Sequence, residues 1–322
     1  MSKTIIEFSI PTDVYEQAKV ICEHNGLTVE EACVRFLEAT VACRDLPFPY
    51  TQQDIEYAKK LGVTMFMIFV TGDCHSEFQK FSTAAFPEQR EMTKDDIVII
   101  CGDFGAVWNA DGVSNSEAYW LNWLDEKPFT TVFVDGNHEN FDRLNSEFEV
   151  VDFHGGKAHK INKSVYHLMR GEIYDFEGKK FLAFGGARSH DIDDGILSWE
   201  DYDTQEEFKE TVRKWRKQRK IFRINHVSWW AEELPSDDEI KIAERNLEKV
   251  NFEVDYVLSH CAPQSIVSWL MGGYTKPDKL TMYFEDLAQR LKFKNWFFGH
   301  YHDDRKIMGK FILLYDQIVR IQ

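Results

Sequence analysis

The stretch IVIICGDFGAVW, residues 97–108, begins with an apolar run and then changes abruptly to Gly102-Asp103. A short, continuous apolar run bounded by turn residues is typical of a strand buried on both faces, as in a parallel sheet. A carboxylate directly after such a strand lies at the sheet edge where α/β proteins bind their ligands. The stretch therefore predicts a buried strand over Ile97 to Cys101, with Asp103 at a functional edge.

Other short apolar runs repeat this arrangement, and helical patterns fall between several of them. They cover residues 65–71, 131–134, 180–184, 256–259 and 296–298. Strands that alternate with helices indicate an α/β sheet protein with functional residues at the strand ends. The last segment, Lys306 to Ile321, is predicted to form a hairpin around Met308-Gly309-Lys310 that completes a sheet.

Metal-ligating residue types follow five of the six runs. In chain order they are Asp73-Cys74-His75, Gly102-Asp103, Gly136-Asn137-His138-Glu139, His260 and Gly299-His300-Tyr301-His302. One such motif alone has structural explanations, because an Asp after a strand often caps a helix and a single His is often a packed residue. Their recurrence at strand ends, which takes up five of the 11 histidines, predicts a shared metal site.

This order of motifs resembles that of the calcineurin-like metallophosphoesterases over most of residues 65 to 305. The resemblance implies a four-layer α/β/β/α sandwich and two metal ions that share Asp103. It implies one ion held by Asp73, His75, Asp103 and His302, and a second held by Asp103, Asn137, His260 and His300. The implied reaction is hydrolysis of a phosphodiester or phosphomonoester by a hydroxide that the two ions activate.

The residue types suit that chemistry. Nitrogen and oxygen donors without thiolates favour two divalent transition metals, Mn, Fe or Zn, over Ca²⁺. By the same resemblance, His138 is a catalytic residue that protonates the leaving oxygen or stabilises the charged transition state; the alternative is a histidine that only hydrogen-bonds a metal ligand. The chain departs from the most common family pattern after Asp103, because no second acidic residue or Asn follows it closely. We expect this departure to affect the residues around the substrate more than the metal ligands.

Two basic features lie outside these motifs. Arg188 follows a predicted strand and could reach a substrate phosphate, although a surface Arg in a tight turn is an equal alternative. Seven basic residues between Arg213 and Arg223 are predicted on one helix. We favour a solvated helix whose charges pair with preceding glutamates, with phosphate or nucleic-acid contact as the alternative.

Residues 1–48 have a different pattern. An alternating strand precedes a helix that ends at Asn25-Gly26, and Thr28 with Glu31 predicts a capping box for a second helix. The segment resembles ribbon-helix-helix proteins of the RelB/DinJ antitoxin type, which implies a homodimer or higher oligomer. Residues 1–48 are thus predicted to form a dimerisation module, and residues 49–322 the phosphoesterase domain. DNA or a protein partner is possible for the module but not favoured.

The formal net charge of −16 disfavours long duplex nucleic acid and suits a small phosphorylated substrate, for which we favour a nucleotide. No window reaches the roughly 18 apolar residues of a membrane span, and no signal pattern opens the chain, so a cytoplasmic protein without membrane contact is expected. The competing hypothesis is a DNA-binding or antitoxin-like regulator whose metal domain senses a ligand. Removal of residues 1–48 discriminates between the two: the enzyme hypothesis predicts that metal-dependent turnover is retained, and the regulator hypothesis predicts that binding, its only measurable activity, disappears.

Overall fold

The computed structural model describes residues 12–24, 26–35 and 66–321. The chain divides into two compact units, Met1–Met65 together with Gln322, and Phe66–Ile321. None of the described helices is both long and apolar enough to cross a membrane. The predicted strand before residue 9 and the predicted domain boundary at residues 48–49 lie outside the described residues.

The described part of the first unit contains two helical stretches joined by a turn. Helix α1 spans Thr12–His24, and residues 29–35 are helical after Gly26, which has a φ of +71°. The backbone N–H of Glu31 donates to Oγ1 of Thr28, and the backbone N–H of Thr28 donates to Oε2 of Glu31. This reciprocal pair is the capping box that the sequence predicts.

The larger unit contains a first, seven-stranded sheet with the order β15-β1-β2-β3-β6-β5-β4. Strands β1, β2, β3 and β6 run parallel, whereas β15, β5 and β4 extend the sheet by antiparallel pairing. The bounds are β1 Ile68–Thr71, β2 Ile97–Cys101, β3 Thr130–Val134, β4 Glu149–Phe153, β5 Gly156–Asn162, β6 Val165–Leu168 and β15 Ile318–Ile321.

The second sheet has six strands in the order β13-β14-β12-β11-β8-β7. Its central strands β8, β11, β12 and β14 are parallel. The bounds are β7 Ile173–Phe176, β8 Lys179–Phe184, β11 Tyr256–Ser259, β12 Asn295–Phe298, β13 Arg305–Ile307 and β14 Phe311–Leu313. All six predicted strands are therefore present, with ends that differ by at most a few residues.

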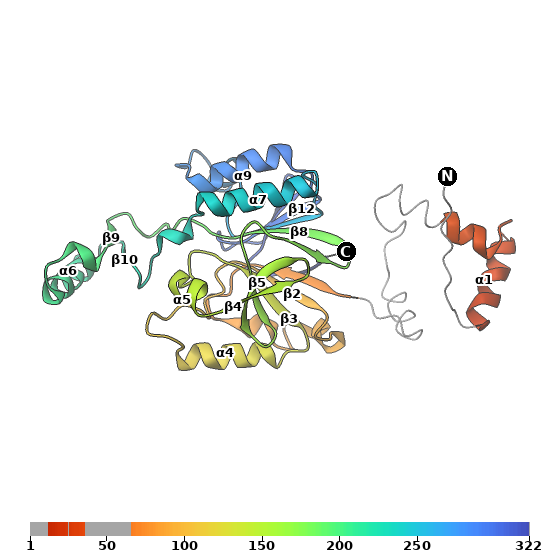
Figure 1. Ribbon diagram of the computed structural model, residues 1–322, viewed down its shortest axis with the longest axis horizontal. Coiled ribbons are helices and arrows are strands. Elements are labelled where there is room, and N and C mark those ends of the chain that lie inside the picture. The colour runs from red at the N-terminus through yellow and green to blue at the C-terminus, as the bar shows by residue number, and fades with distance from the viewer. Residues whose placement is uncertain (1–11, 25, 36–65, 322) are drawn as a thin grey trace. The chain divides into compact units, whose positions relative to one another are not determined.

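The two sheets stack face to face, and helices cover their outer faces (Figure 1). The helices are α4 Asn115–Asp125 and α5 Phe141–Ser146 on the first sheet, and α7 Asp237–Lys249, α8 Gln264–Leu270 and α9 Lys279–Arg290 on the second. Side chains alternate along each buried strand. In β2, Val98 and Ile100 pack into the core under α4, while Ile97 and Ile99 pack into the core between the sheets. The predicted four-layer α/β/β/α sandwich is confirmed.

The last predicted hairpin is only partly right. Strands β13 and β14 pair antiparallel around Met308-Gly309-Lys310 and close the second sheet. The chain then crosses to the first sheet, where β15 pairs antiparallel with β1. Ile321 is buried between the sheets, so this last strand joins the two halves of the sandwich.

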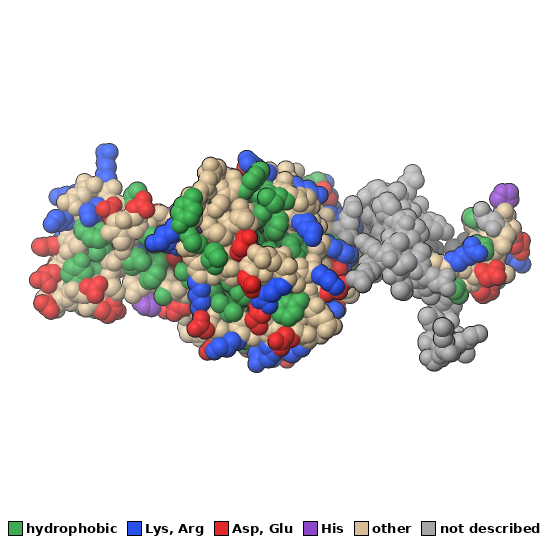
Figure 2. Space-filling model, turned by 90° about the horizontal axis from the view of Figure 1, so that it is seen from above, with side chains coloured by type: hydrophobic (Ala, Val, Ile, Leu, Met, Phe, Trp, Pro, Cys, Tyr) green, Lys and Arg blue, Asp and Glu red, His purple; other side chains and the backbone are tan. Residues whose placement is uncertain are grey.

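An arm interrupts the sandwich between β8 and β11. It contains β9 Gly195–Leu197, the 3-10 turn Trp199–Asp201, α6 Gln205–Lys217 and β10 Phe222–Ile224, and its two strands pair parallel. Figure 1 shows α6 standing away from the sheets, and Figure 2 shows acidic and basic side chains mixed over this arm. The prediction that Arg223 belongs to the basic helix is wrong. The helix ends at Lys217, and Arg223 lies on β10 with its side chain buried.

Candidate metal centre

The carboxyl ends of five strands from both sheets meet at one edge of the sandwich. Asp73 follows β1, Asp103 follows β2, and Asn137 and His138 follow β3. The other two strands place His260 directly after β11 and His300 and His302 after β12. Asp103, His300 and His302 have positive φ, as does His75, two residues after Asp73. Such conformations cost free energy and concentrate at functional sites.

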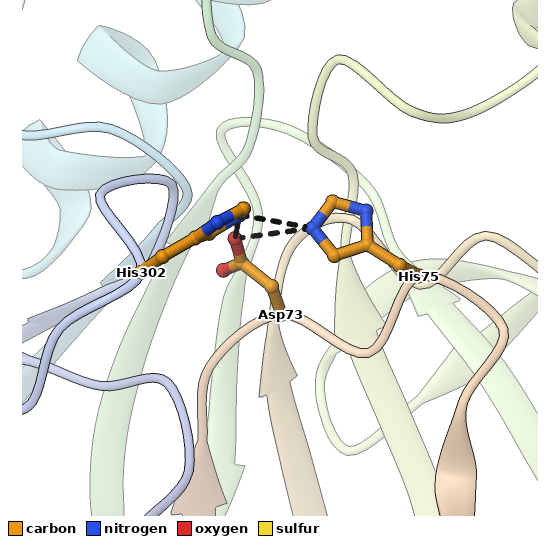
Figure 3. A group of neighbouring side chains, drawn as sticks. All are labelled: Asp73, His75 and His302. Atoms are coloured by element: carbon orange, nitrogen blue, oxygen red, sulfur yellow. Dashed lines mark hydrogen bonds and ion pairs between the residues drawn. The ribbon is translucent and has the colours of Figure 1, made fainter.

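One group of ligand atoms consists of Asp73, His75 and His302 (Figure 3). The Nε2 atoms of His75 and His302 are 3.1 Å apart. Oδ2 of Asp73 lies 3.2 Å from Nε2 of His302 and 3.6 Å from Nε2 of His75. Donors that each lie about 2.1 Å from one cation are separated from one another by about these distances. The three side chains thus form a triangle that fits a single ion.

A second group consists of Asp103, His260 and His300. Nε2 of His260 lies 3.1 Å from Oδ1 of Asp103. The other oxygen of Asp103, Oδ2, lies 3.7 Å from Nε2 of His75 in the first group. Asp103 therefore presents one oxygen to each group, as a carboxylate between two cations must.

Two buried polar atoms here have no hydrogen-bond partner among the described residues. They are Oδ1 of Asn137 and Nε2 of His260, which is close to Asp103 but not in hydrogen-bond geometry. A buried polar atom without a partner costs about 1–3 kcal/mol, so such atoms require an explanation. Coordination of a cation supplies that partner, and the donor set of imidazole, carboxylate and amide oxygen suits a divalent transition metal.

The electrostatics of the site also favour a cation. Burial raises the pKa of Asp73, but the charge of His260 and hydrogen bonds from the neighbouring histidines outweigh it and hold this pKa below its ordinary value. Burial lowers the pKa of His260, yet Asp103 and Asp73 overcome this effect and raise it to about 10. The two buried carboxylates, Asp73 and Asp103, therefore place negative charge where a divalent ion would be stabilised.

Glu139 joins the two loops that carry Asp103 and Asn137. Its Oε1 accepts a hydrogen bond from the backbone N–H of Phe104, and its Oε2 accepts one from the backbone N–H of Gly136. Burial, together with the charge of Asp103, raises the pKa of Glu139 to about 8. The spacing of Asp103 and Asn137 thus depends on the buried side chain of Glu139.

Lys80 performs a similar role for the first motif. Its Nζ donates to the backbone carbonyls of Gly72, Asp73 and Tyr315, which fixes the turn after β1 against the loop before β15.

Close packing explains the glycines of the motifs. A Cβ added at Gly136 would lie 2.1 Å from Oδ1 of Asp103, and one at Gly299 would lie 2.0 Å from Oδ1 of Asp73.

His138 contacts Arg223, a residue that the sequence pattern predicts on the basic helix. Its backbone N–H donates to Oδ1 of Asp103, and its ring packs against Trp108. Nη2 of Arg223, from the arm, lies 3.1 Å from Nε2 of His138. Asp191 and the carbonyl of Ser228 hold the rest of this guanidinium. No local pattern places Arg223 on an inward face, because the alternation Phe222-Arg223-Ile224 would put the arginine opposite the two apolar side chains, whereas Arg223 is the more buried of the three.

The remaining predicted site residue, Arg188, lies next to the metal-ligand groups rather than within them. It lines a cavity that also borders His300. Cys74 is buried and, among the described residues, contributes no atom to the ligand groups. The structure thus brings together all eight residues predicted for metal binding and catalysis, and sets Arg188 beside them.

Residues 66–304 match the family model described as calcineurin-like phosphoesterase. Because this match covers well over half of the chain, the protein belongs to the calcineurin-like phosphoesterase family. It is similar to lariat debranching enzyme A of Xenopus laevis, with 28% identity over 159 residues, which is 45% of this chain and 27% of the relative. It is also similar to the lariat debranching enzymes of Gallus gallus and Homo sapiens, each with 23% identity over 262 residues. That alignment covers 73% of this chain but only 42% of either relative. The chain therefore spans less than half the length of these relatives.

Proposed function

We propose that this phosphoesterase hydrolyses a phosphodiester bond in a nucleotide-containing substrate. The proposal rests on the two ligand groups, which lie on either side of Asp103. It also rests on two buried atoms, Oδ1 of Asn137 and Nε2 of His260, that have no hydrogen-bond partner among the described residues. The similarity to lariat debranching enzymes supports a diester over a monoester as the bond that is cleaved.

We assign Asp73, His75, Asp103 and His302 to one divalent ion, and Asp103, Asn137, His260 and His300 to a second. When bound, two such ions supply positive charge to the phosphoryl oxygens and lower the pKa of water. The family uses divalent ions, and the nitrogen-rich donor set supports Mn, Fe or Zn here. The protein itself fixes the donors in place through the backbone contacts of Glu139 and Lys80.

His138 is the candidate for contact with the leaving oxygen. An arginine can only donate hydrogen bonds, so the contact from Arg223 makes Nε2 of His138 an acceptor and leaves its proton on Nδ1. Burial lowers the pKa of His138 to about 4, and the charge of Arg223 acts in the same direction against that of Asp103. These features support a neutral hydrogen-bond donor that stabilises developing negative charge, in preference to a cationic acid.

The first test is hydrolysis of bis-p-nitrophenyl phosphate and p-nitrophenyl phosphate by the full chain reconstituted with Mn²⁺, Fe²⁺ or Zn²⁺. We expect turnover of the diester to exceed that of the monoester, and to disappear on chelation and in Asp103→Ala. The exposed variant Asp152→Ala, on β4, is the control for loss of a carboxylate. Equal turnover by Asp103→Ala and wild type would refute the assignment.

We also propose that residues 1–48 form a homodimerisation module. The two helical stretches and the Thr28–Glu31 capping box support this reading. Sedimentation of the full chain and of a chain that lacks residues 1–48 provides the test. We expect a dimer or larger for the first and a monomer for the second, with Mn²⁺-dependent diester hydrolysis retained in both. A full chain that binds a ligand without hydrolysing either ester, and that loses this binding on truncation, would instead favour the regulator hypothesis.

A further inference from the structure

A cavity of about 710 Å³ opens beside the metal-ligand groups. Its walls come from segments that follow β8, β11 and β12, so it lies at the same edge of the second sheet as His260 and His300. His300 itself lines the cavity, and its ring packs 4.6 Å from that of His190, another lining residue. The volume falls within the range of roughly 300–1,000 Å³ that is usual for small-ligand pockets.

Two cationic side chains of the lining, Arg188 and Lys276, form no ion pair or hydrogen bond with any residue that the structure describes. The chain has a net charge of −16, so acidic side chains that could pair with these two cations are plentiful. Their lack of a carboxylate partner leaves their positive charge available to an anionic ligand. The lining also includes Asp278 and the exposed Asp193. Asp278 already accepts the backbone N–H groups of Leu280 and Thr281 at the start of α9, which offset its charge.

The rim loop after α8, which contributes Met271, Thr275 and Lys276 to the cavity lining, carries exposed aromatic and apolar groups. Tyr274 is 88% exposed, and it lies in the chain beside the lining residue Thr275. Met271, also in the lining, is 52% exposed. The Nε2 atom of Gln264 donates to both the carbonyl and Oγ1 of Thr275, so the rim loop is tied to α8. An exposed aromatic side chain on a fixed loop is suited to stack on a nucleobase.

We propose that this cavity binds a nucleotide adjacent to the scissile phosphate of a single-stranded nucleic acid. Arg188 and Lys276 contact a flanking phosphate, and Tyr274 stacks on a base. The proposal rests on the proposed function, because it places the scissile phosphate at the metal-ligand groups beside His300. Proteins that bind single-stranded nucleic acid without sequence preference combine two features. Cationic side chains contact the phosphates, and aromatic side chains stack on the bases.

The test measures binding and hydrolysis separately in the full chain. Binding of 5′-fluorescein-labelled pentanucleotides of RNA and of DNA with the same sequence is followed by anisotropy, without added metal, at several salt concentrations. Arg188→Ala and Lys276→Ala should each weaken binding about tenfold or more, since charge-assisted contacts to phosphate are lost. Each should also reduce the slope of log K against log salt by about 0.7, as expected for one phosphate contact to a single strand. Tyr274→Ala should weaken binding at least about fivefold and leave the slope unchanged.

The controls are Lys306→Ala on β13 and Tyr119→Ala on α4, both exposed residues outside the cavity lining. Hydrolysis of bis-p-nitrophenyl phosphate, which has no flanking nucleotide, should change less than twofold in the two control variants. Cavity variants that bind both pentanucleotides as wild type does would overturn the proposal. Equal weakening by the cavity variants and by the controls would also overturn it.

The two proposals fail in different ways. If the wild type does not hydrolyse the small diester but loses pentanucleotide binding on cavity substitution, the hydrolase proposal falls and the nucleotide site stands. If it hydrolyses the small diester but the cavity variants bind normally, the hydrolase proposal stands and the nucleotide site falls. Preference for the RNA or the DNA pentamer identifies which backbone the cavity accepts.

Discussion

Nη2 of Arg223 lies 3.1 Å from Nε2 of His138, although the two residues are 85 positions apart in the chain. The arginine comes from the arm between β8 and β11, whereas the histidine follows β3 of the other sheet. The arm therefore sets the tautomer of a histidine at the metal-ligand groups. Asp191 and the carbonyl of Ser228, both from the same segment between β8 and β11, hold the guanidinium of Arg223 in this position.

Arg223→Ala should lower kcat for bis-p-nitrophenyl phosphate by at least about tenfold, because His138 loses the donor that fixes its ring and its proton. KM should change much less, since Arg223 acts through His138. Arg223→Lys is expected to restore part of kcat, because one donor can still reach the ring. Arg216→Ala, on the exposed surface of α6, is the matched control for loss of a cation from the arm. A loss confined to KM would mean that Arg223 binds substrate directly.

Asn137→Ala should weaken the binding of one of two Mn²⁺ ions by at least about tenfold, because its orphaned Oδ1 is assigned as a ligand. Isothermal titration with Mn²⁺ measures the two affinities, and elemental analysis after gel filtration should find close to one retained ion instead of two. Asn295→Ala, at the start of β12 and outside the ligand groups, is the control. Two ions bound with unchanged affinity would remove Asn137 from the site.

Gly102→Ala should abolish metal binding, and Gly112→Ala should not. Both glycines have φ near +90°, so an alanine costs about 1–2 kcal/mol of backbone strain at either position. A Cβ at Gly102 would in addition meet Nδ1 of His260 at 2.1 Å, whereas nothing lies within 4 Å of a Cβ at Gly112. Thermal unfolding with and without Mn²⁺ separates the two effects. We expect the ion to stabilise Gly112→Ala but not Gly102→Ala.

The strands, and the clustering of the candidate ligands at their ends, were predictable because both leave local signals. Strand β2 is buried on both faces and reads as an unbroken apolar run that ends at Gly102-Asp103. By contrast, β4 alternates between exposed and half-buried positions and pairs only with β5, so it leaves no apolar run to recognise. Strand β15 is similarly half-buried except at Ile321. Its place in the first sheet depends on a long-range pairing that no local pattern specifies.

Residues that act through distant contacts were missed or misplaced for the same reason. Arg223 belongs to a row of basic residues in the sequence, and only the end of α6 at Lys217 separates it from the solvated ones. The cavity is built from loops after three different strands, so the proximity of Arg188 to Lys276 is a property of the tertiary fold. Motif spacing identifies candidate metal ligands, because each lies at a strand end, but it does not identify the residues that line the cavity beside them.

A buried histidine away from the ligand groups makes a prediction for stability at acid pH. Nδ1 of His159 lies 3.0 Å from Nδ1 of His167, whose Nε2 contacts Oδ1 of Asp135. Burial, and next the charge of His167, lowers the pKa of His159 from 6.5 to about 4. The unfolded chain therefore binds a proton at His159 between about pH 6.5 and 4 while the folded chain does not, and the free energy of unfolding falls as the pH falls through that window.

His159→Gln, which cannot become charged, should reduce this acid-induced loss of stability by about 3 kcal/mol between pH 7 and pH 4. The measurement is urea unfolding of the full chain at several pH values, with the slope of stability against pH compared between variant and wild type. Absolute stability will also fall at neutral pH, because His167 loses a partner, so only the slope tests the prediction. His154→Asn is the control, since His154 is exposed and Asn tolerates its positive φ. Identical slopes for wild type and His159→Gln would mean that His159 accepts its proton in the folded chain as readily as in the unfolded one.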